Sequence, residues 1–205
     1  MTKTSNMYWL LLGLTLILVG YFLPWLSHPA SGLTLIGLDI SEWTKFMPQM
    51  GSGELPHRDL FYVPPITLGI CLALCSVGQT NGWRPWLLRG LALLVAFISF
   101  PSIDAIRFEP SGEWRPRLIL IGVVLLFALA AVWLDRLPQW VVNLLLGLTA
   151  GVGFVLPTYL FWVLLPVLES WLVLDFQIGW GLWLNGVGHL LVAGMALWTI
   201  SPNEA

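Results

Sequence analysis

The sequence has 205 residues, of which 58% are hydrophobic and 10% are charged, and its formal net charge is −2 at neutral pH. Soluble domains carry about 25% charged residues, and a soluble protein of this length has no means of burying so much apolar surface, whereas a bilayer removes that need. The weakly acidic balance excludes a nucleic-acid binder that relies on a basic patch. We therefore expect a single transmembrane domain, residues 1–205, built only from α-helices.

Apolar intervals with almost no charge predict about six transmembrane helices, because a helix must run for about 17–25 residues to cross the hydrocarbon layer. The intervals are 7–26, 60–78, 86–103, 118–134, 140–165 and 178–200. Indole rings prefer the headgroup level of a membrane, and six spans place all thirteen tryptophans near one face or the other. The tryptophans therefore support an all-α, six-helix membrane bundle.

The positions of the basic residues predict the orientation of the bundle. With the N-terminus inside, the cytoplasmic segments hold Lys3, Arg84, Arg89 and Arg136 in very short stretches. The outer loops hold five basic residues together with most of the acids. The density of positive charge therefore favours a cytoplasmic N-terminus.

The outer loop 27–59 is the one long loop between the predicted spans. It contains Asp39 and Glu42 at the spacing of a capped helix start, and apolar residues at i, i+3, i+4 and i+7 follow. These residues are Trp43, Phe46, Met47 and Met50. The pattern predicts a short amphipathic interfacial helix in which Trp43, Phe46 and Met47 contact lipid or a partner protein.

His189 is the most distinctive polar residue, because it lies near the middle of the last predicted span. A polar ring at that depth is costly unless it is satisfied. Imidazole is able to contact a quinone, a haem or a chlorophyll, and Asn185 lies one turn earlier on the same helix. The alternative is a hydrogen bond between helices. His189 and Asn185 are thus the candidate cofactor-binding residues, and no other cofactor is expected.

Arg89 is the one charged residue inside a predicted span, and its long side chain is able to reach lipid phosphates or a partner carboxylate from there. The acids of the outer loops are scattered, with no metal-binding or hydrolytic motif among them. They are expected to be solvated charges. We therefore predict no catalytic residue, no metal site and no enzyme activity.

Two stretches carry a resemblance to a known group of proteins. The residues Phe22-Leu23-Pro24-Trp25, together with Gly37 to Trp43, resemble the first span and loop of uncharacterised multi-pass membrane proteins of filamentous anoxygenic phototrophs. The resemblance implies a multi-pass protein of the bacterial cytoplasmic (inner) membrane. It also implies an accessory place in an alternative complex III type of quinol-oxidising assembly, because none of that assembly's haem or iron–sulfur ligands is matched here.

Three classes of function follow. The first is an accessory, non-catalytic structural subunit of a larger respiratory or photosynthetic electron-transport complex, with other integral membrane subunits and lipids, but no nucleic acid, as partners. The second is a transporter or channel component, in which Pro64, Pro65 and Pro157 break helices around a path. The third is a membrane-embedded protein that binds a quinone, a pigment or a lipid.

Overall fold

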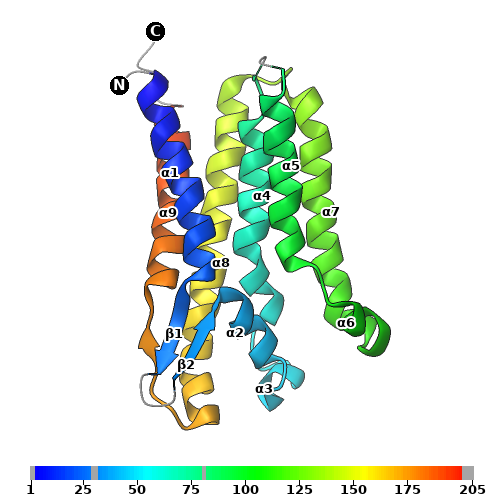
Figure 1. The fold of residues 1–205 in the computed structure, drawn as a ribbon, viewed down its shortest axis with the longest axis vertical. Coiled ribbons are helices and arrows are strands. Elements are labelled where there is room, and N and C mark those ends of the chain that lie inside the picture. Colours follow the sequence, from blue (N-terminus) through cyan, green and yellow to red (C-terminus); the bar gives the residue numbers. More distant parts are fainter. Residues whose placement is uncertain (1–2, 29–31, 80–81, 200–205) are drawn as a thin grey trace.

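The structure, a computed structural model, describes residues 3–28, 32–79 and 82–199. Within them, six long helices lie side by side in an elongated bundle (Figure 1). They are α1 (Lys3–Phe22), α4 (Val63–Cys75), α5 (Arg84–Ala96), α7 (Ser111–Leu134), α8 (Gln139–Leu172) and α9 (Trp180–Trp198). The start of α1 and the end of α9 lie together at one end of the bundle.

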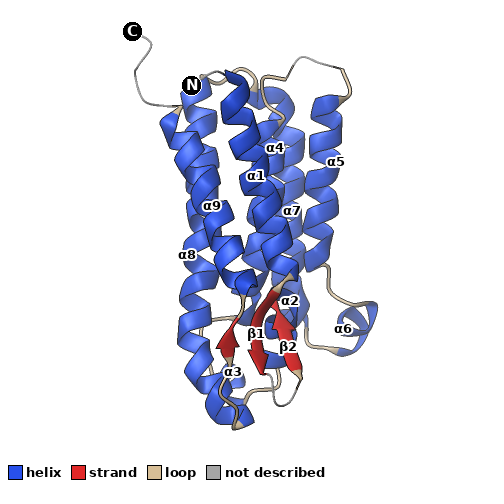
Figure 2. Ribbon diagram, turned by 60° about the vertical axis from the view of Figure 1, so that its left-hand side comes forward, coloured by secondary structure: helices blue, strands red, loops and turns tan. Residues whose placement is uncertain are grey.

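Short elements cover the opposite end of the bundle and are called the cap here (Figure 2). The strands of the cap are β1 (Pro24–His28), β2 (Leu33–Ile36) and β3 (Gln177–Ile178). Its helical elements are α2 (Gly37–Thr44), α3 (Pro48–Gly51), α6 (Ile103–Phe108) and the 3-10 turns η1 (Arg58–Tyr62) and η2 (Phe97–Ser99). The strands form a small antiparallel sheet in the order β2-β1-β3, with Leu26 opposite both Leu35 and Ile178. Sequence analysis did not predict this sheet.

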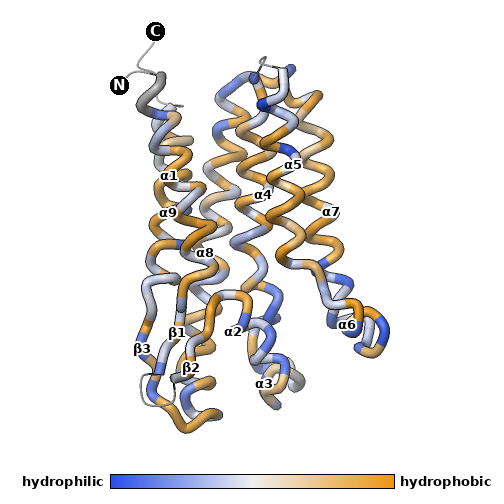
Figure 3. The backbone as a smooth tube through the Cα atoms, viewed as in Figure 1, coloured by the Kyte–Doolittle hydropathy of each residue, from blue (hydrophilic) through white to orange (hydrophobic). Residues whose placement is uncertain are grey.

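The all-helical bundle is confirmed, and it is consistent with a membrane protein. In the described part of the chain, four helices are long and apolar enough to cross a membrane: η1 joined to α4, then α7, α8 and α9. The other two predicted spans, 7–26 and 86–103, correspond to helices that are not among these four. Their helices are α1, whose apolar part is Asn6–Phe22, and α5, which has 13 residues. Figure 3 shows the hydrophobic middle of the bundle between more hydrophilic ends.

The helix ends differ from the predicted span boundaries where a proline or a charged turn is present. Helix α1 ends at Phe22 rather than at residue 26, because Pro24 has no N–H with which to continue the helix, and Pro24–His28 is β1 instead. Helix α7 begins at Ser111 rather than at residue 118, and α8 runs to Leu172 rather than to residue 165. Those extra turns carry charges, so an apolar interval does not include them.

The predicted amphipathic helix after Asp39 was also wrong in its extent. Helix α2 starts at Gly37, with the Asp39 carboxylate accepting a hydrogen bond from the Ile36 N–H at 3.2 Å, and it ends at Thr44. The Thr44 hydroxyl bonds back to the Ser41 carbonyl at 3.1 Å, and Pro48 then opens the separate helix α3. The chain therefore turns between two short helices, and the apolar residues of this segment do not share one face.

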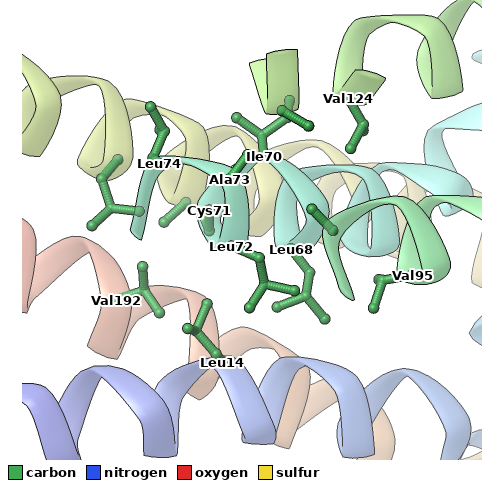
Figure 4. Packing of buried hydrophobic residues seen from close by; sticks show 14 of the residues in the cluster. Leu14, Leu68, Ile70, Cys71, Leu72, Ala73, Leu74, Val95, Val124 and Val192 are labelled. Atoms are coloured by element: carbon green, nitrogen blue, oxygen red, sulfur yellow. The ribbon is translucent and has the colours of Figure 1, made fainter. Parts of the chain in front are cut away.

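Two hydrophobic cores hold the molecule together. The bundle core lies between α4 and its neighbours, and Figure 4 shows Leu68 and Leu72 of α4 facing Leu14 of α1 and Val95 of α5. The cap core joins the sheet to the cap ends of α8 and α9. Trp25 is fully buried in it, with its indole Nε1 donating to the Gly20 carbonyl at 2.9 Å. The end of α1 is thus bonded directly to the cap.

Candidate functional site

The predicted cofactor residue His189 is fully buried between α9, α4 and α8. Its Nδ1 lies 2.9 Å from the Asn185 carbonyl, and its Nε2 lies 3.0 Å from the hydroxyl of Thr67 on α4. The Asn185 side-chain amide donates to the Ile17 carbonyl of α1 at 3.0 Å. These two polar residues therefore connect three helices, and both ring nitrogens of His189 have partners.

Two glycines pack closely against His189 and Asn185 and leave no free space beside them. A Cβ added at Gly153 of α8 would lie 2.2 Å from the His189 Nε2, and one added at Gly20 of α1 would lie 2.3 Å from the Asn185 backbone nitrogen. Real Cβ atoms essentially never come this close to other atoms, so not even a methyl group fits there. The geometry favours a hydrogen bond between helices at His189 over contact with a ring-shaped cofactor.

Arg89 of α5 turns into the protein. Its Nε donates to the Ser76 hydroxyl at 3.0 Å, and its guanidinium stacks on Trp86 at 5.1 Å from the ring centre. Ser76 in turn donates to the Ala73 carbonyl at 2.7 Å. The residue is buried, so the predicted contact with lipid or a partner gains no support from its position.

The three predicted contact residues of the outer loop divide into two groups. Phe46 is 68% exposed and Trp43 is also exposed, whereas Met47 is 1% exposed and belongs to the cap core. The break after Thr44 causes this difference, because it turns Met47 inward. Trp43 and Phe46 remain available to lipid or a partner.

A buried cluster of charges, which sequence analysis treated as scattered and solvated, lies where the cap meets α4 and α7. Arg58 is 2% exposed; its Nη2 lies 2.9 Å from the Glu113 carboxylate, and its Nη1 lies 3.2 Å from the Ser41 carbonyl. Arg117 is also buried; its Nη1 lies 2.8 Å from Glu42, and its Nε lies 3.4 Å from Asp59. Residues from α2, η1 and α7 thus form one ion cluster.

Tyr62, the last residue of η1, also belongs to this ion cluster. Its hydroxyl donates to the Glu42 carboxylate, and the Arg117 guanidinium lies 4.3 Å from the centre of its ring. Burial raises the pKa of Glu42, but the hydrogen bond from Tyr62 and the charges of Arg117 and Arg58 together outweigh it. The pKa therefore lies below the ordinary 4.5. Glu42 is thus an ionised carboxylate at neutral pH.

A cavity of about 220 Å³, called the cap pocket here, opens beside the ion cluster. Its polar lining consists of Glu42, Lys45, Tyr62, Ser102, Glu109 and Arg117. The remaining wall is apolar and includes Leu38, Ile98, Phe100 and Ala105. A second cavity of about 300 Å³ lies by His57, Arg58 and Glu113. Both cavities thus lie at the cap and are lined partly by charged side chains.

Sequence reasoning missed the ion cluster because its members are far apart in the chain. Arg58 and Glu113 are 55 residues apart, and Arg117 and Asp59 are 58 apart. The available signal was the position of Arg58 and Arg117 at the cap-side ends of apolar intervals, where an unpaired charge is costly.

The charged and polar side chains that line the two cavities are suited to binding charged or polar groups. Among the described residues, no group of three or more His, Cys, Asp or Glu side chains could hold a metal ion. The charges of the ion cluster are directed at one another, which stabilises a shape. No protein-family model, curated protein or solved structure matches this chain.

Proposed function

We propose that this chain acts as an accessory, non-catalytic subunit of a larger membrane complex. In this proposal it is a multi-pass protein of the bacterial cytoplasmic membrane, with six spans and a cytoplasmic N-terminus. The third predicted class, a lipid-binding protein, has a separate observation in its favour, which is the cap pocket.

Six spans are supported by the lengths of the two remaining long helices of the bundle, α1 and α5. Helix α1 has 20 residues, about 30 Å at 1.5 Å per residue, which matches the hydrocarbon thickness. Helix α5 and η2 together give about 25 Å, because a 3-10 turn rises about 2 Å per residue. Exposed tryptophans also mark the end opposite the cap: Trp9, Trp83, Trp86, Trp133, Trp140 and Trp198. Indole rings at one level are typical of a membrane interface.

The observation that carries the accessory role is the open face of α7. Only 22% of its most apolar 18-residue window is buried, against 89% for the central helix that contains α4. Ile119, Leu126 and Leu129 are exposed on this face, and Gly122 lies between them with nothing within 4 Å of an added Cβ. Small residues let helices approach closely in a membrane. A glycine between exposed large residues therefore fits a partner helix better than it fits lipid.

A transport path is less well supported. The polar groups deep in the bundle, Thr67, Asn185 and His189, bond to one another and to backbone carbonyls. Gly153 packs against two of them with no room for a methyl group. A path for a polar substrate needs polar groups that face open space at this depth.

The accessory role is tested by Gly122→Leu on α7, with Gly194→Leu on α9 as the control. Both glycines have open space around them, but they lie on helices at opposite sides of the bundle. We expect tagged wild-type protein, extracted from its native membrane in mild detergent, to carry stoichiometric partner subunits. Gly122→Leu should reduce that recovery about fivefold or more, since overpacking costs about 1–3 kcal/mol, and Gly194→Leu should not.

The outcomes of this experiment are distinct. Wild-type protein that elutes as a stable monomer without partners would refute the accessory role. So would equal recovery of partners with Gly122→Leu and with wild type, because the open face of α7 would then be a lipid-facing surface.

A further inference from the structure

We propose that the cap pocket binds the headgroup of a zwitterionic phospholipid that carries a primary ammonium, with the phosphate and the ammonium held by separate groups of side chains. This inference does not rest on the accessory role. At about 30 Å³ per water molecule, the volume of about 220 Å³ equals about seven waters, which is enough for a phosphate and a short amine.

Three side chains that line the cap pocket, Arg117, Lys45 and Ser102, carry N–H or O–H donors that suit a phosphate. Arg117 uses its Nε and Nη1 in ion pairs with Asp59 and Glu42, and its Nη2 has no partner among the described residues. Lys45 donates to Glu109 at 3.1 Å, and its ammonium also forms an ion pair with Glu42 at 3.7 Å, which is too long for a hydrogen bond, so N–H groups of Lys45 remain for a ligand. Ser102 accepts from the Ala105 N–H at 3.0 Å, which leaves its hydroxyl hydrogen free to donate. Charged donors of this kind form strong hydrogen bonds with phosphate oxygens.

Two carboxylates that also line the cap pocket favour a ligand that carries an ammonium as well as a phosphate. Glu42 and Glu109 face the cap pocket together with Lys45 and Arg117, so two negative charges balance two positive ones. A ligand with only negative charge would be repelled by both glutamates, and a ligand with only positive charge would be repelled by the lysine and the arginine. A zwitterion that places its phosphate near Lys45 and its ammonium near Glu109 satisfies both.

The apolar surroundings of the cap pocket point to a lipid as the source of this headgroup. Ile98 and Phe100, at the cap end of α5, form its apolar wall. Next to them α6 stands away from the bundle axis (Figure 1), with Ile103 exposed and Phe108 81% exposed. Large apolar side chains exposed on a short helix at the end of a membrane bundle are typical of an interfacial position. In this proposal the acyl chains lie along the exposed side chains of Leu94 in α5 and Phe97 in η2.

The test uses the full-length protein in detergent micelles. Native mass spectrometry measures binding of phosphatidylethanolamine, phosphatidylcholine and phosphatidylglycerol, each with the same acyl chains, and soluble phosphoethanolamine is the competitor. We expect one phosphatidylethanolamine to bind about tenfold tighter than the other two lipids. The quaternary amine of phosphatidylcholine donates no hydrogen bond, and phosphatidylglycerol brings no positive charge to Glu109.

Two pairs of variants separate the two ends of the headgroup. Lys45→Gln should weaken binding of all three lipids about tenfold, whereas Arg107→Gln, which removes an exposed charge from the same region, should not. Glu109→Gln should abolish the preference for phosphatidylethanolamine over phosphatidylglycerol, whereas the control Asp104→Asn should keep it. Thermal unfolding equal to that of wild type shows that each variant is folded.

Several results would overturn the proposal. Equal binding of the three lipids, or tighter binding of phosphatidylglycerol, would remove the selection by Glu109. Loss of binding in Arg107→Gln equal to that in Lys45→Gln would show nonspecific attraction of charge. Displacement of the lipid by phosphoethanolamine at a similar concentration would assign the cap pocket to a soluble zwitterion instead of a lipid.

Discussion

The packing of Gly153 against His189 gives a sharp test of the bundle, through the substitution Gly153→Ala. The added methyl group would lie 2.2 Å from the His189 Nε2 and 2.4 Å from the Thr67 Oγ1, so α8 or the ring must move. Overpacking of this kind costs about 1–3 kcal/mol. Loss of the hydrogen bond between Thr67 and His189 adds about 1 kcal/mol. The expected loss of unfolding free energy is therefore about 2–4 kcal/mol.

Gly151→Ala is a matched control on the same helix. Gly151 lies two residues earlier and has nothing within 4 Å of an added Cβ. Alanine is a better helix former than glycine, so we expect this change to be neutral or to stabilise by up to about 1 kcal/mol. Reversible unfolding in mixed micelles with increasing denaturing detergent, followed by circular dichroism, measures both free energies.

A double-substituted background checks the cause of the destabilisation. With His189→Ala and Thr67→Ala together, the two atoms closest to the added methyl group are gone. Gly153→Ala should then cost less than about 1 kcal/mol more than the background. If Gly153→Ala costs as much there as in wild type, or if it is harmless in wild type, the close contact described here is not the source of stability.

Three further predictions concern the cap and the membrane topology. Arg58→Met should lower the unfolding free energy by about 1.5–3 kcal/mol, because the buried guanidinium bonds the Glu113 carboxylate and the Ser41 carbonyl. The control Arg115→Met, at an exposed position, should change it by less than about 0.5 kcal/mol. Equal effects of the two substitutions would refute a structural role for the ion cluster. The folded-state pKa of Glu42 is lowered, so its contribution to stability is present above the unfolded pKa of 4.5 and is lost as the pH falls through the lower folded value. The melting temperature of wild type should thus fall towards that of Glu42→Gln between about pH 5 and pH 3, and a constant difference would contradict the shift. The topology is tested in a chain whose native cysteines have been replaced, with an impermeant maleimide applied to intact cells. The reagent should label Glu54→Cys in the cap, but it should label Arg136→Cys only after the cells are permeabilised. Labelling of both positions from outside would exclude six spans with a cytoplasmic N-terminus.

The helical bundle was predictable because a membrane span is a local property of the sequence. A charge-free apolar interval locates a helix, as α9 shows by covering Trp180–Trp198 of the predicted 178–200, but it misses charged end turns such as those of α7 and α8. The small sheet was not predictable in this way. Leu26 pairs with Ile178 across 152 residues of sequence, and no local sequence pattern predicts such a pairing. The cap end of the first apolar interval therefore looked like helix although it is strand.

The polar residues show the same contrast between what a local sequence pattern predicts and what only long-range contacts determine. The position of His189 inside a span was evident from its apolar neighbours, and so was its need for a hydrogen-bond partner. Thr67 as that partner was not, because it lies on α4, 122 residues away. The ion cluster was hidden for the same reason. Charges outside apolar intervals look solvated in a sequence, and only the tertiary fold brings Glu42, Asp59 and Glu113 around two arginines.

The contrast between the two arginines and their acids explains how a buried ion cluster is tolerated here. Removing an isolated guanidinium from water costs several kcal/mol. Arg58 and Arg117 are nearly inaccessible, whereas the side chains of Glu42 and Glu113 remain 40% and 44% exposed. Their carboxylates therefore keep part of their hydration while they neutralise the arginines. The net gain in stability is limited, but the bonds have direction, and we infer that they hold α2, η1 and the start of α7 in one arrangement that the apolar contacts of the cap alone would not select. The cap pocket lies beside these segments and shares Glu42 and Arg117 with the ion cluster, so we infer that the cluster helps to fix the shape of the pocket.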